Sequence, residues 1–232
     1  MLKNKLHRIL LLITLTLGIS FSAFAQSGNL PYVDGKFIHF GFLLGINTMD
    51  FGISQNAGDS INAGLKTLKP GFSVGIISDL RLNRYLNLRF TPTLHFADRQ
   101  LNYNSSNGFK DSLSITSIPI CLPLYLKYSA ERKGNYRPYL IFGGGVYYDL
   151  GRKTTGDDLK VVLNPIDFYA EFGVGCDIYF SFFKLAPELK FAIGFNDMLD
   201  HDYVPTNPDN VKYTQTISKL TSRMLTLSFN FE

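Results

Sequence analysis

Cysteine, histidine and tryptophan are scarce in this sequence, and the chemistry that depends on the first two is scarce with them. There are two cysteines, four histidines and no tryptophan, and no CxxC pair or Cys/His cluster predicts a metal site. The strand parity described below places Cys121 and Cys176 on opposite faces of a sheet, so we expect two free thiols and no disulfide. The run Gly143–Gly145 lies within an expected strand and lacks the Lys-Ser/Thr signature of a phosphate loop, so no cofactor is expected.

Long apolar runs are also missing once the first 25 residues are set aside. Lys3, Lys5 and Arg8 precede a short apolar stretch, and residues 23–25 read Ala-Phe-Ala. A basic start, a short apolar core and a small-x-small cleavage site predict a secretory signal peptide over residues 1–25, with an N-terminal membrane anchor as the alternative. No later apolar run reaches the roughly 18–20 residues that a membrane-spanning helix needs.

A strong net charge of one sign is absent as well. The whole sequence is formally +4, but the first 25 residues hold three of the 23 basic residues and none of the 19 acidic ones, which leaves the mature chain at about +1. No nucleic-acid partner is therefore predicted. An exported chain that is rich in Phe and Tyr but has no hydrophobic helix is either a secreted β-domain or a membrane β-barrel, the one non-helical structure that satisfies its backbone hydrogen bonds in lipid.

The mature sequence does contain alternation with a period of two residues, which is the period of a β-strand. Residues 166–180 show it best, because every even position is apolar while the odd positions carry three carboxylates and two glycines. Seven further segments follow the rule, with apolar faces over residues 38–46, 72–82, 86–96, 118–128, 140–150, 183–195 and 225–231. Strands of about 9–13 residues are long enough to cross a bilayer at a tilt.

The connections between these segments alternate in length. Short connections are expected at residues 83–84, 129–135 and 181–182, and long loops at residues 48–70, 97–114, 151–165 and 196–221. This rhythm is typical of outer-membrane barrels, in which short turns face the periplasm and long loops face outward. We therefore predict an all-β fold in the cell outer membrane: an eight-stranded antiparallel up-and-down transmembrane β-barrel over residues 37–232, preceded by a periplasmic segment over residues 26–36.

Glycine distinguishes a barrel with a lipid-facing apolar surface from a lipocalin-like barrel with an apolar lumen. The polar face of the segments holds Gly41, Gly45, Gly75, Gly143, Gly145, Gly173, Gly175 and Gly194. In a narrow eight-stranded barrel the crowded side is the interior, where glycine fits best. The polar face is therefore predicted to point inward and the apolar face to point toward lipid.

The charged residues of the polar face would then lie inside the barrel. They comprise six cations and six anions: Arg81, Arg89, Lys127, Arg137, Lys184 and Lys190, with Asp79, Asp149, Asp167, Glu171, Asp177 and Glu188. A lumen this narrow is filled by side chains, and buried charges have to pair. We predict a structural interior charge network that plugs the barrel, and a conduit for ions or protons is the alternative.

No nucleophile and base are placed together in a way that predicts catalysis. His39 and His95 fall on the interior face, where a hydrogen-bonded structural role is expected, and His201 lies between Asp200 and Asp202 in the last long loop. His201 would serve as a base in a lipid-modifying hydrolase, but no nucleophile is identifiable beside it. The chain is therefore predicted not to be an enzyme, with no catalytic, cofactor-binding or metal-binding residues and no identified small-molecule substrate.

Five stretches of the sequence resemble one family of outer-membrane barrels. They are Phe42–Phe51 (FLLGINTMDF), Ser78–Phe90 (SDLRLNRYLNLRF), Tyr136–Leu150 (YRPYLIFGGGVYYDL), Phe183–Phe195 (FKLAPELKFAIGF) and Leu225–Glu232 (LTLSFNFE). In these stretches the chain resembles the PorT (SprT) family of Bacteroidetes, whose members are required for the type IX secretion system and, in gliding species, for motility. The resemblance spans about residues 35–232 and carries over no catalytic or cofactor residues.

The resemblance implies a non-enzymatic barrel that is required for protein secretion by the type IX system. Its partners would be outer-membrane lipid and other secretion-system components. With a plugged lumen it would not carry cargo itself, and its loops would contribute contacts to a larger assembly. The long outer loops leave open a different function, that of a small adhesion or envelope-integrity barrel with no secretion role.

Overall fold

A computed structural model of the full sequence describes residues 29–55, 61–64, 69–105, 110–151, 162–201, 203 and 217–232. The predicted signal peptide lies outside the described residues. A 3₁₀ turn, η1 (Val33–Gly35), precedes eleven strands that form one antiparallel sheet. The strands are β1 (Ile38–Gln55), β2 (Ile61–Gly64), β3 (Pro70–Arg81), β4 (Leu86–Phe90), β5 (Thr93–Ser105), β6 (Lys110–Ser117), β7 (Pro119–Ser129), β8 (Tyr136–Asp149), β9 (Ile166–Tyr179), β10 (Lys184–Gly194) and β11 (Ile217–Phe231).

None of the helical segments in the described part of the chain is long and apolar enough to span a membrane.

Two of the breaks between strands occur at prolines. β4 and β5 keep one register against β3, and β4–β5 keep one register against β6–β7. Pro92 separates β4 from β5, and Pro119 begins β7; proline has no N–H to donate to the ladder. β4–β5 therefore form one continuous strand of the wall, as do β6–β7, while β2 lies in the first long connection and pairs with β5.

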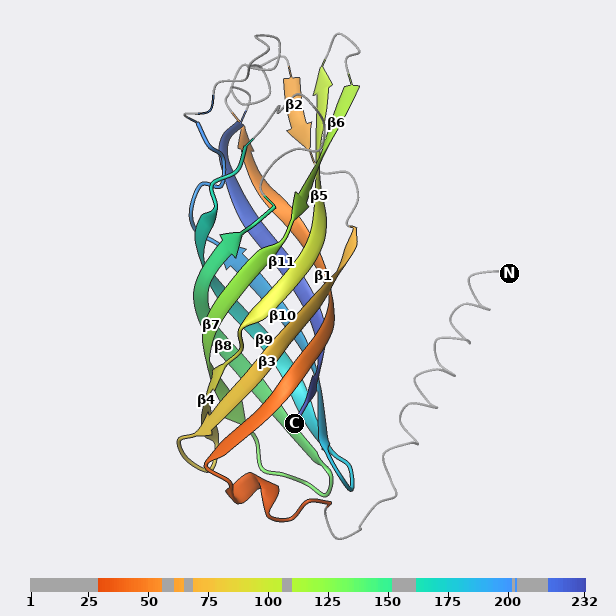
Figure 1. Ribbon diagram of the computed structural model, residues 1–232, viewed down its shortest axis with the longest axis vertical. Helices are drawn as coiled ribbons and strands as arrows, with labels where there is room; N and C mark the ends of the chain where they lie inside the picture. The colour runs from red at the N-terminus through yellow and green to blue at the C-terminus, as the bar shows by residue number, and fades with distance from the viewer. Residues whose placement is uncertain are drawn as a thin grey trace, which may run out of the picture.

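The sheet closes into a barrel because β1 pairs with both β3 and β11. Each wall strand then has two antiparallel neighbours, and the ring runs β1, β3, β4–β5, β6–β7, β8, β9, β10, β11 and back to β1. This confirms the predicted eight-stranded up-and-down barrel (Figure 1). We call the end that holds the short connections 82–85, 130–135 and 180–183 the turn end, and the opposite end the loop end.

The two faces of the wall differ as the alternation predicts. On β8 and β9 the outward-facing Phe142 and Phe172 are 62% and 53% exposed, whereas the inward-facing Glu171 is 3% exposed. The outward faces of the other wall strands are likewise rich in exposed Phe, Leu and Ile side chains. The barrel therefore has an apolar belt outside and a polar interior, which is the arrangement that a hydrocarbon surrounding requires.

The predicted loop over residues 97–114 is wrong for most of its length. β5 continues to Ser105 and β6 begins at Lys110, and the two pair from Ala97↔Ser117 to Asn104↔Lys110. Strand β11 likewise begins at Ile217, well before the predicted start at residue 225. Beyond the apolar belt the outward positions of a strand have no lipid to face, so the apolar alternation ends while the backbone pairing continues.

Close approach of strands explains the glycines of β8. A Cβ added to Gly143 would collide with the carbonyl oxygen of Leu124, and one added to Gly145 would collide with that of Leu122. Both carbonyls belong to β7, the neighbouring strand. Side chains at these two positions would push β7 and β8 apart, so the tight wall at this point depends on glycine.

Replacing Gly143 by alanine is expected to destabilise the barrel by about 1–3 kcal/mol, because the new Cβ meets backbone atoms that cannot rotate away. Urea unfolding of the refolded barrel in detergent measures the loss. Gly35→Ala is the matched control, since a Cβ at Gly35 meets nothing within 4 Å. Equal stability of the two variants would contradict the proposed role of the glycine.

Candidate functional site

Arg89 on β4 connects opposite sides of the barrel interior. Its side chain is 1% exposed and contacts three carboxylates: Asp79 at 2.7 Å, Glu232 at 2.7 Å and Glu188 at 3.5 Å. Asp79 lies on the neighbouring strand β3, while Glu188 lies on β10, which stands opposite β4 in the ring of wall strands. One guanidinium therefore bridges the lumen from wall to wall.

Two branches of ion pairs extend from these carboxylates. In the first, Lys184 lies 2.7 Å from Glu232 and 3.9 Å from Asp177, which in turn lies 2.8 Å from Lys127. In the second, Lys190 lies 3.6 Å from Glu188 and 3.8 Å from Glu171. We call the connected set the lumen network; its members are Asp79, Arg89, Lys127, Glu171, Asp177, Lys184, Glu188, Lys190 and Glu232.

Buried tyrosines complete the coordination of the lumen network. The hydroxyl of Tyr139 donates to Glu188 at 2.7 Å, and that of Tyr125 donates to Glu171. The ammonium of Lys127 lies 4.0 Å from the centre of the Tyr139 ring, within range of a cation–π contact. Each tyrosine thus offers a hydroxyl to a carboxylate and a ring face to a cation, and together they fill the space between the charged groups.

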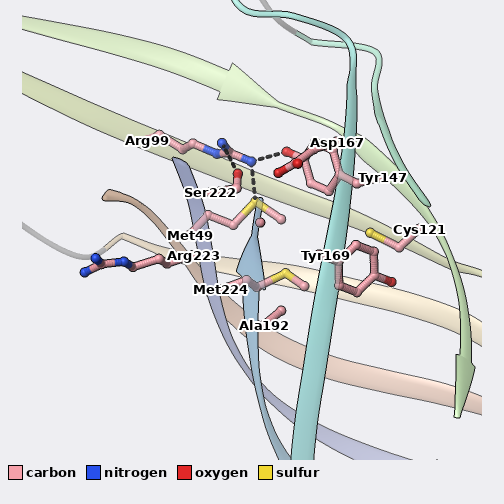
Figure 2. A pocket seen from close by; sticks show the side chains of 11 residues that line it. Met49, Arg99, Cys121, Tyr147, Asp167, Tyr169, Ala192, Ser222, Arg223 and Met224 are labelled. Atoms are coloured by element: carbon pink, nitrogen blue, oxygen red, sulfur yellow. Dashed lines mark hydrogen bonds between the residues drawn. The ribbon is translucent and has the colours of Figure 1, made fainter. Parts of the chain in front are cut away.

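Arg99 on β5 makes a second crossing of the lumen, nearer the loop end. It donates to Ser222 Oγ at 2.8 Å and to the hydroxyl of Tyr147, and its Nη2 lies 3.5 Å from Met49 Sδ (Figure 2). These partners come from β11, β8 and β1. The side chain is 1% exposed, so a second arginine closes the interior at this level.

A cavity of about 20 Å³ lies beside Arg99, which is room for about one water molecule. Three buried atoms of its lining residues lack a hydrogen-bond partner within the described residues: Arg99 Nε, Asp167 Oδ2 and Tyr169 Oη. The surface of the cavity is mostly apolar, and the cavity is too small for a substrate.

Eight of the twelve charged residues predicted to lie inside the barrel meet in the lumen network. They are Asp79, Arg89, Lys127, Glu171, Asp177, Lys184, Glu188 and Lys190. Of the others, Asp149 is buried and accepts hydrogen bonds from the hydroxyls of Ser117 and Tyr147. Asp167 is buried at the level of Arg99 and accepts a hydrogen bond from the backbone N–H of Asn196. Arg81 and Arg137 lie outside the network, at strand ends of the turn end. Their predicted place in the network was wrong because parity fixes the face of a residue but not its depth along the barrel.

Glu232 and Arg99 are absent from the interior charges predicted from the sequence. Both keep the inward parity of their strand, but each lies beyond the last apolar residue that marked the segment. Extending the parity past that residue would have found them. As expected, Cys121 and Cys176 are free thiols.

The three histidines that the structure describes have nearby polar partners. His95 Nδ1 lies 2.7 Å from Ser73 Oγ inside the barrel, and His39 Nε2 lies 2.8 Å from the carbonyl oxygen of Val33. His201 Nε2 lies 3.0 Å from Asp197 Oδ2, and Asp197 Oδ1 accepts hydrogen bonds from the backbone N–H groups of Leu199 and Leu220. No group of His, Cys, Asp and Glu in the described part of the chain is arranged to hold a metal ion.

Residues 29–36, which we call the strap, fold across the turn end. Asp34 in η1 lies 3.3 Å from both Arg132 and Arg137 and accepts a hydrogen bond from the hydroxyl of Tyr179 at 2.5 Å. Burial acts to raise the pKa of Asp34, but the hydrogen bonds from Tyr179 and Arg132 and the charges of the two arginines outweigh it. The pKa of Asp34 is therefore held below its usual value of 3.8.

Comparison with known proteins places this architecture in context. The family described as an outer membrane protein beta-barrel domain matches residues 24–200. Neisserial surface protein A is 12% identical, over 84% of this chain and 98% of that one, with a TM-score of 0.44. OprG of Pseudomonas aeruginosa is 11% identical, over 84% and 91%, with a TM-score of 0.44. The outer membrane protein AlkL in DMPC bilayers is 14% identical, over 91% and 95%, with a TM-score of 0.38. No curated protein matches the chain.

Replacing Arg89 by methionine is expected to lower the free energy of unfolding by about 3–5 kcal/mol, because three buried carboxylates lose their shared cation. Urea unfolding measures the change. Lys69→Met is the control: the Lys69–Asp98 pair is 38% and 42% exposed and should be worth less than about 1 kcal/mol. A loss at Arg89 no larger than at Lys69 would contradict the central place of Arg89.

The strap is expected to detach in acid. Because the pKa of Asp34 is lower in the folded chain than in the free one, its contribution to docking is complete above the usual value of 3.8 and is lost as the pH falls through the lowered pKa. A nitroxide label at Gly35→Cys, with Cys121 and Cys176 replaced by serine, reports the release as a gain in mobility. In Asp34→Asn the label should be mobile at neutral pH; an immobile label there would contradict the role of Asp34.

Proposed function

This chain belongs to the family of outer-membrane protein β-barrel domains, and we propose that it is a non-enzymatic component of a protein secretion machine, the type IX system. It spans the outer membrane, with the turn end in the periplasm and the loop end outside. The five stretches that resemble the PorT family, among them Ser78–Phe90 and Leu225–Glu232, support the choice of machine.

The filled lumen supports the proposal that the barrel binds other components of the secretion system and does not conduct polypeptides through its interior. Arg89 and Arg99 cross the interior at two levels, and each is 1% exposed. The lumen network and the tyrosines around it occupy the space between the walls. A polypeptide could pass only if these buried charges separated, which costs several kcal/mol for each broken pair. Secretion would therefore use the outer surfaces of this barrel.

Two surfaces are available for such contacts. The paired ends of β5 and β6 project from the loop end with β2 beside them (Figure 1). At the turn end, the strap and the short connections form a polar face held by Asp34 and its arginines. Function concentrates on such exposed segments when a rigid scaffold holds them.

The projecting β5–β6 hairpin also favours a second candidate function, adhesion or envelope integrity. A hairpin that continues past the apolar belt presents a folded surface outside the cell, where an adhesive protein needs one. This function would depend on the loop end alone and would leave secretion unaffected.

Deletion of the gene in the native organism is expected to leave cargo with type IX C-terminal domains inside the cell, while other outer-membrane proteins stay at normal levels. Profiling of secreted, surface and periplasmic proteins measures this. A complementing copy of the wild-type gene should restore export, and Lys69→Met should restore it equally because its ion pair is exposed.

Normal export in the deletion strain would overturn the secretion role. If adhesion or detergent resistance were then lost, the second candidate would replace it. A complementing copy without the β5–β6 extension separates the surfaces: rescue of secretion by this copy would place the contacts at the turn end.

A further inference from the structure

A concave polar pocket of about 220 Å³ opens at the turn end. Its charged lining consists of four arginines and two carboxylates: Arg81, Arg84, Arg132, Arg137, Asp34 and Glu131. Arg81 ends β3, Arg137 is the second residue of β8, and the other two arginines lie in the connections 82–85 and 130–135. The chain thus brings cations from distant positions in the sequence to one hollow.

Three of the four arginines are held by backbone carbonyls. Arg132 Nε donates to Gly134 O at 2.8 Å, Arg137 Nε donates to Ala130 O at 3.0 Å, and Arg81 Nε donates to Asn83 O at 3.3 Å. In each case a carbonyl holds the inner nitrogen of the guanidinium. Terminal nitrogens of Arg132 and Arg137 also donate to the carbonyl oxygens of Asn29, Leu30 and Arg84. Within the described residues the terminal nitrogens of Arg81, which are the donors that bind a carboxylate in a fork, have no hydrogen-bond partner.

The positive charge of the pocket is only partly neutralised. Asp34 lies 3.3 Å from Arg132 and from Arg137, and Glu131 lies 3.1 Å from Arg84. Four cations against two carboxylates leave a formal excess of two positive charges. No described carboxylate lies within ion-pair distance of Arg81.

We infer that this arginine pocket is a docking site for an acidic peptide of a periplasmic partner protein. The strap shows how such a ligand sits, since Asp34 is a carboxylate carried on a short peptide and held by two of the four arginines. An incoming Asp- or Glu-rich segment would bind Arg81 and Arg84 and would compete with Asp34 for Arg132 and Arg137. The pocket stands on its own observations and does not depend on the secretion system being type IX.

The position of the pocket favours a peptide over a lipid headgroup. Arg81 and Arg137 share the inward parity of their strands, so they line the mouth of the barrel, whereas the outward-facing Tyr136 and Tyr128 belong to the apolar belt. Lipid lies against the belt, while the mouth is open to the periplasm. A segment reaching the mouth from the periplasm meets the pocket without crossing the bilayer surface.

The test uses the mature chain purified from an outer membrane in a zwitterionic detergent. A fluorescein-labelled hexapeptide amide that alternates Asp and Gly is titrated by fluorescence polarisation, and the same peptide with Asn in place of Asp is the neutral control. The acidic peptide is expected to bind, and its affinity to fall as salt is added. Arg81→Gln/Arg84→Gln is expected to weaken binding by roughly tenfold, because two charge-assisted contacts are lost while the arginines that hold the strap remain.

Asp34→Asn gives an independent check, because it weakens the hold of the strap on Arg132 and Arg137 and removes a competing carboxylate. It is expected to bind the acidic peptide several-fold more tightly than the wild type. Unchanged heat-modified mobility in gel electrophoresis establishes that each variant is folded.

Three results would overturn the inference. One is equal binding of the neutral peptide, and another is full binding by the folded Arg81→Gln/Arg84→Gln variant. The third is binding of inorganic phosphate or of phosphatidylglycerol vesicles by the wild type while the acidic peptide does not bind, which would make the pocket a phosphate or lipid site. If the deletion strain shows the secretion defect but the purified wild-type protein does not bind the acidic peptide, peptide docking in the pocket is refuted and the proposed function stands.

Discussion

Lipid around the wall leaves the charged side chains of the membrane-spanning segments only the lumen, and in the lumen each charge must be compensated by another. Arg89 meets this constraint by binding carboxylates from β3, β10 and the residue after β11. The two branches of ion pairs begin at the carboxylates it holds. Removing its charge would leave anions on opposite walls facing one another across a narrow interior, so the closed lumen and the proposed reliance on outer surfaces both depend on this side chain.

The polar groups of the backbone must also find partners inside the membrane, as the charged side chains do. Pro123 on β7 has no N–H to donate to Thr91, and the hydroxyl of Thr93 donates to the Thr91 carbonyl oxygen at 2.9 Å instead. The N–H of Thr91 still reaches Pro123 O, at 3.4 Å. A side-chain hydroxyl thus replaces the backbone hydrogen bond that is missing where two neighbouring wall strands each contain a proline, and the barrel stays closed there.

Alternation predicted the fold because lipid imposes it on every outward residue of the belt. It predicted faces equally well, which is why Glu171 and Lys190 could be assigned to the interior from the sequence. Depth along the strand leaves no such periodic signal, so Arg137 was grouped with lumen residues although it lies at the mouth beside Asp34. Strand pairing outside the apolar belt also leaves no periodic signal in the sequence, and for that reason Arg99 was predicted to lie in a loop.

The position of both lumen-crossing arginines on one wall strand has a consequence for how the chain chooses its fold. Apolar alternation forbids a strand to slip by one residue but accepts a slip of two, because every side chain then keeps its face. Arg89 and Arg99 lie ten residues apart on β4–β5, and a two-residue slip would carry both about 6.6 Å along the wall, away from Glu188 and Ser222 together. The charged side chains therefore distinguish the native strand register from registers shifted by two residues, which apolar alternation alone does not distinguish.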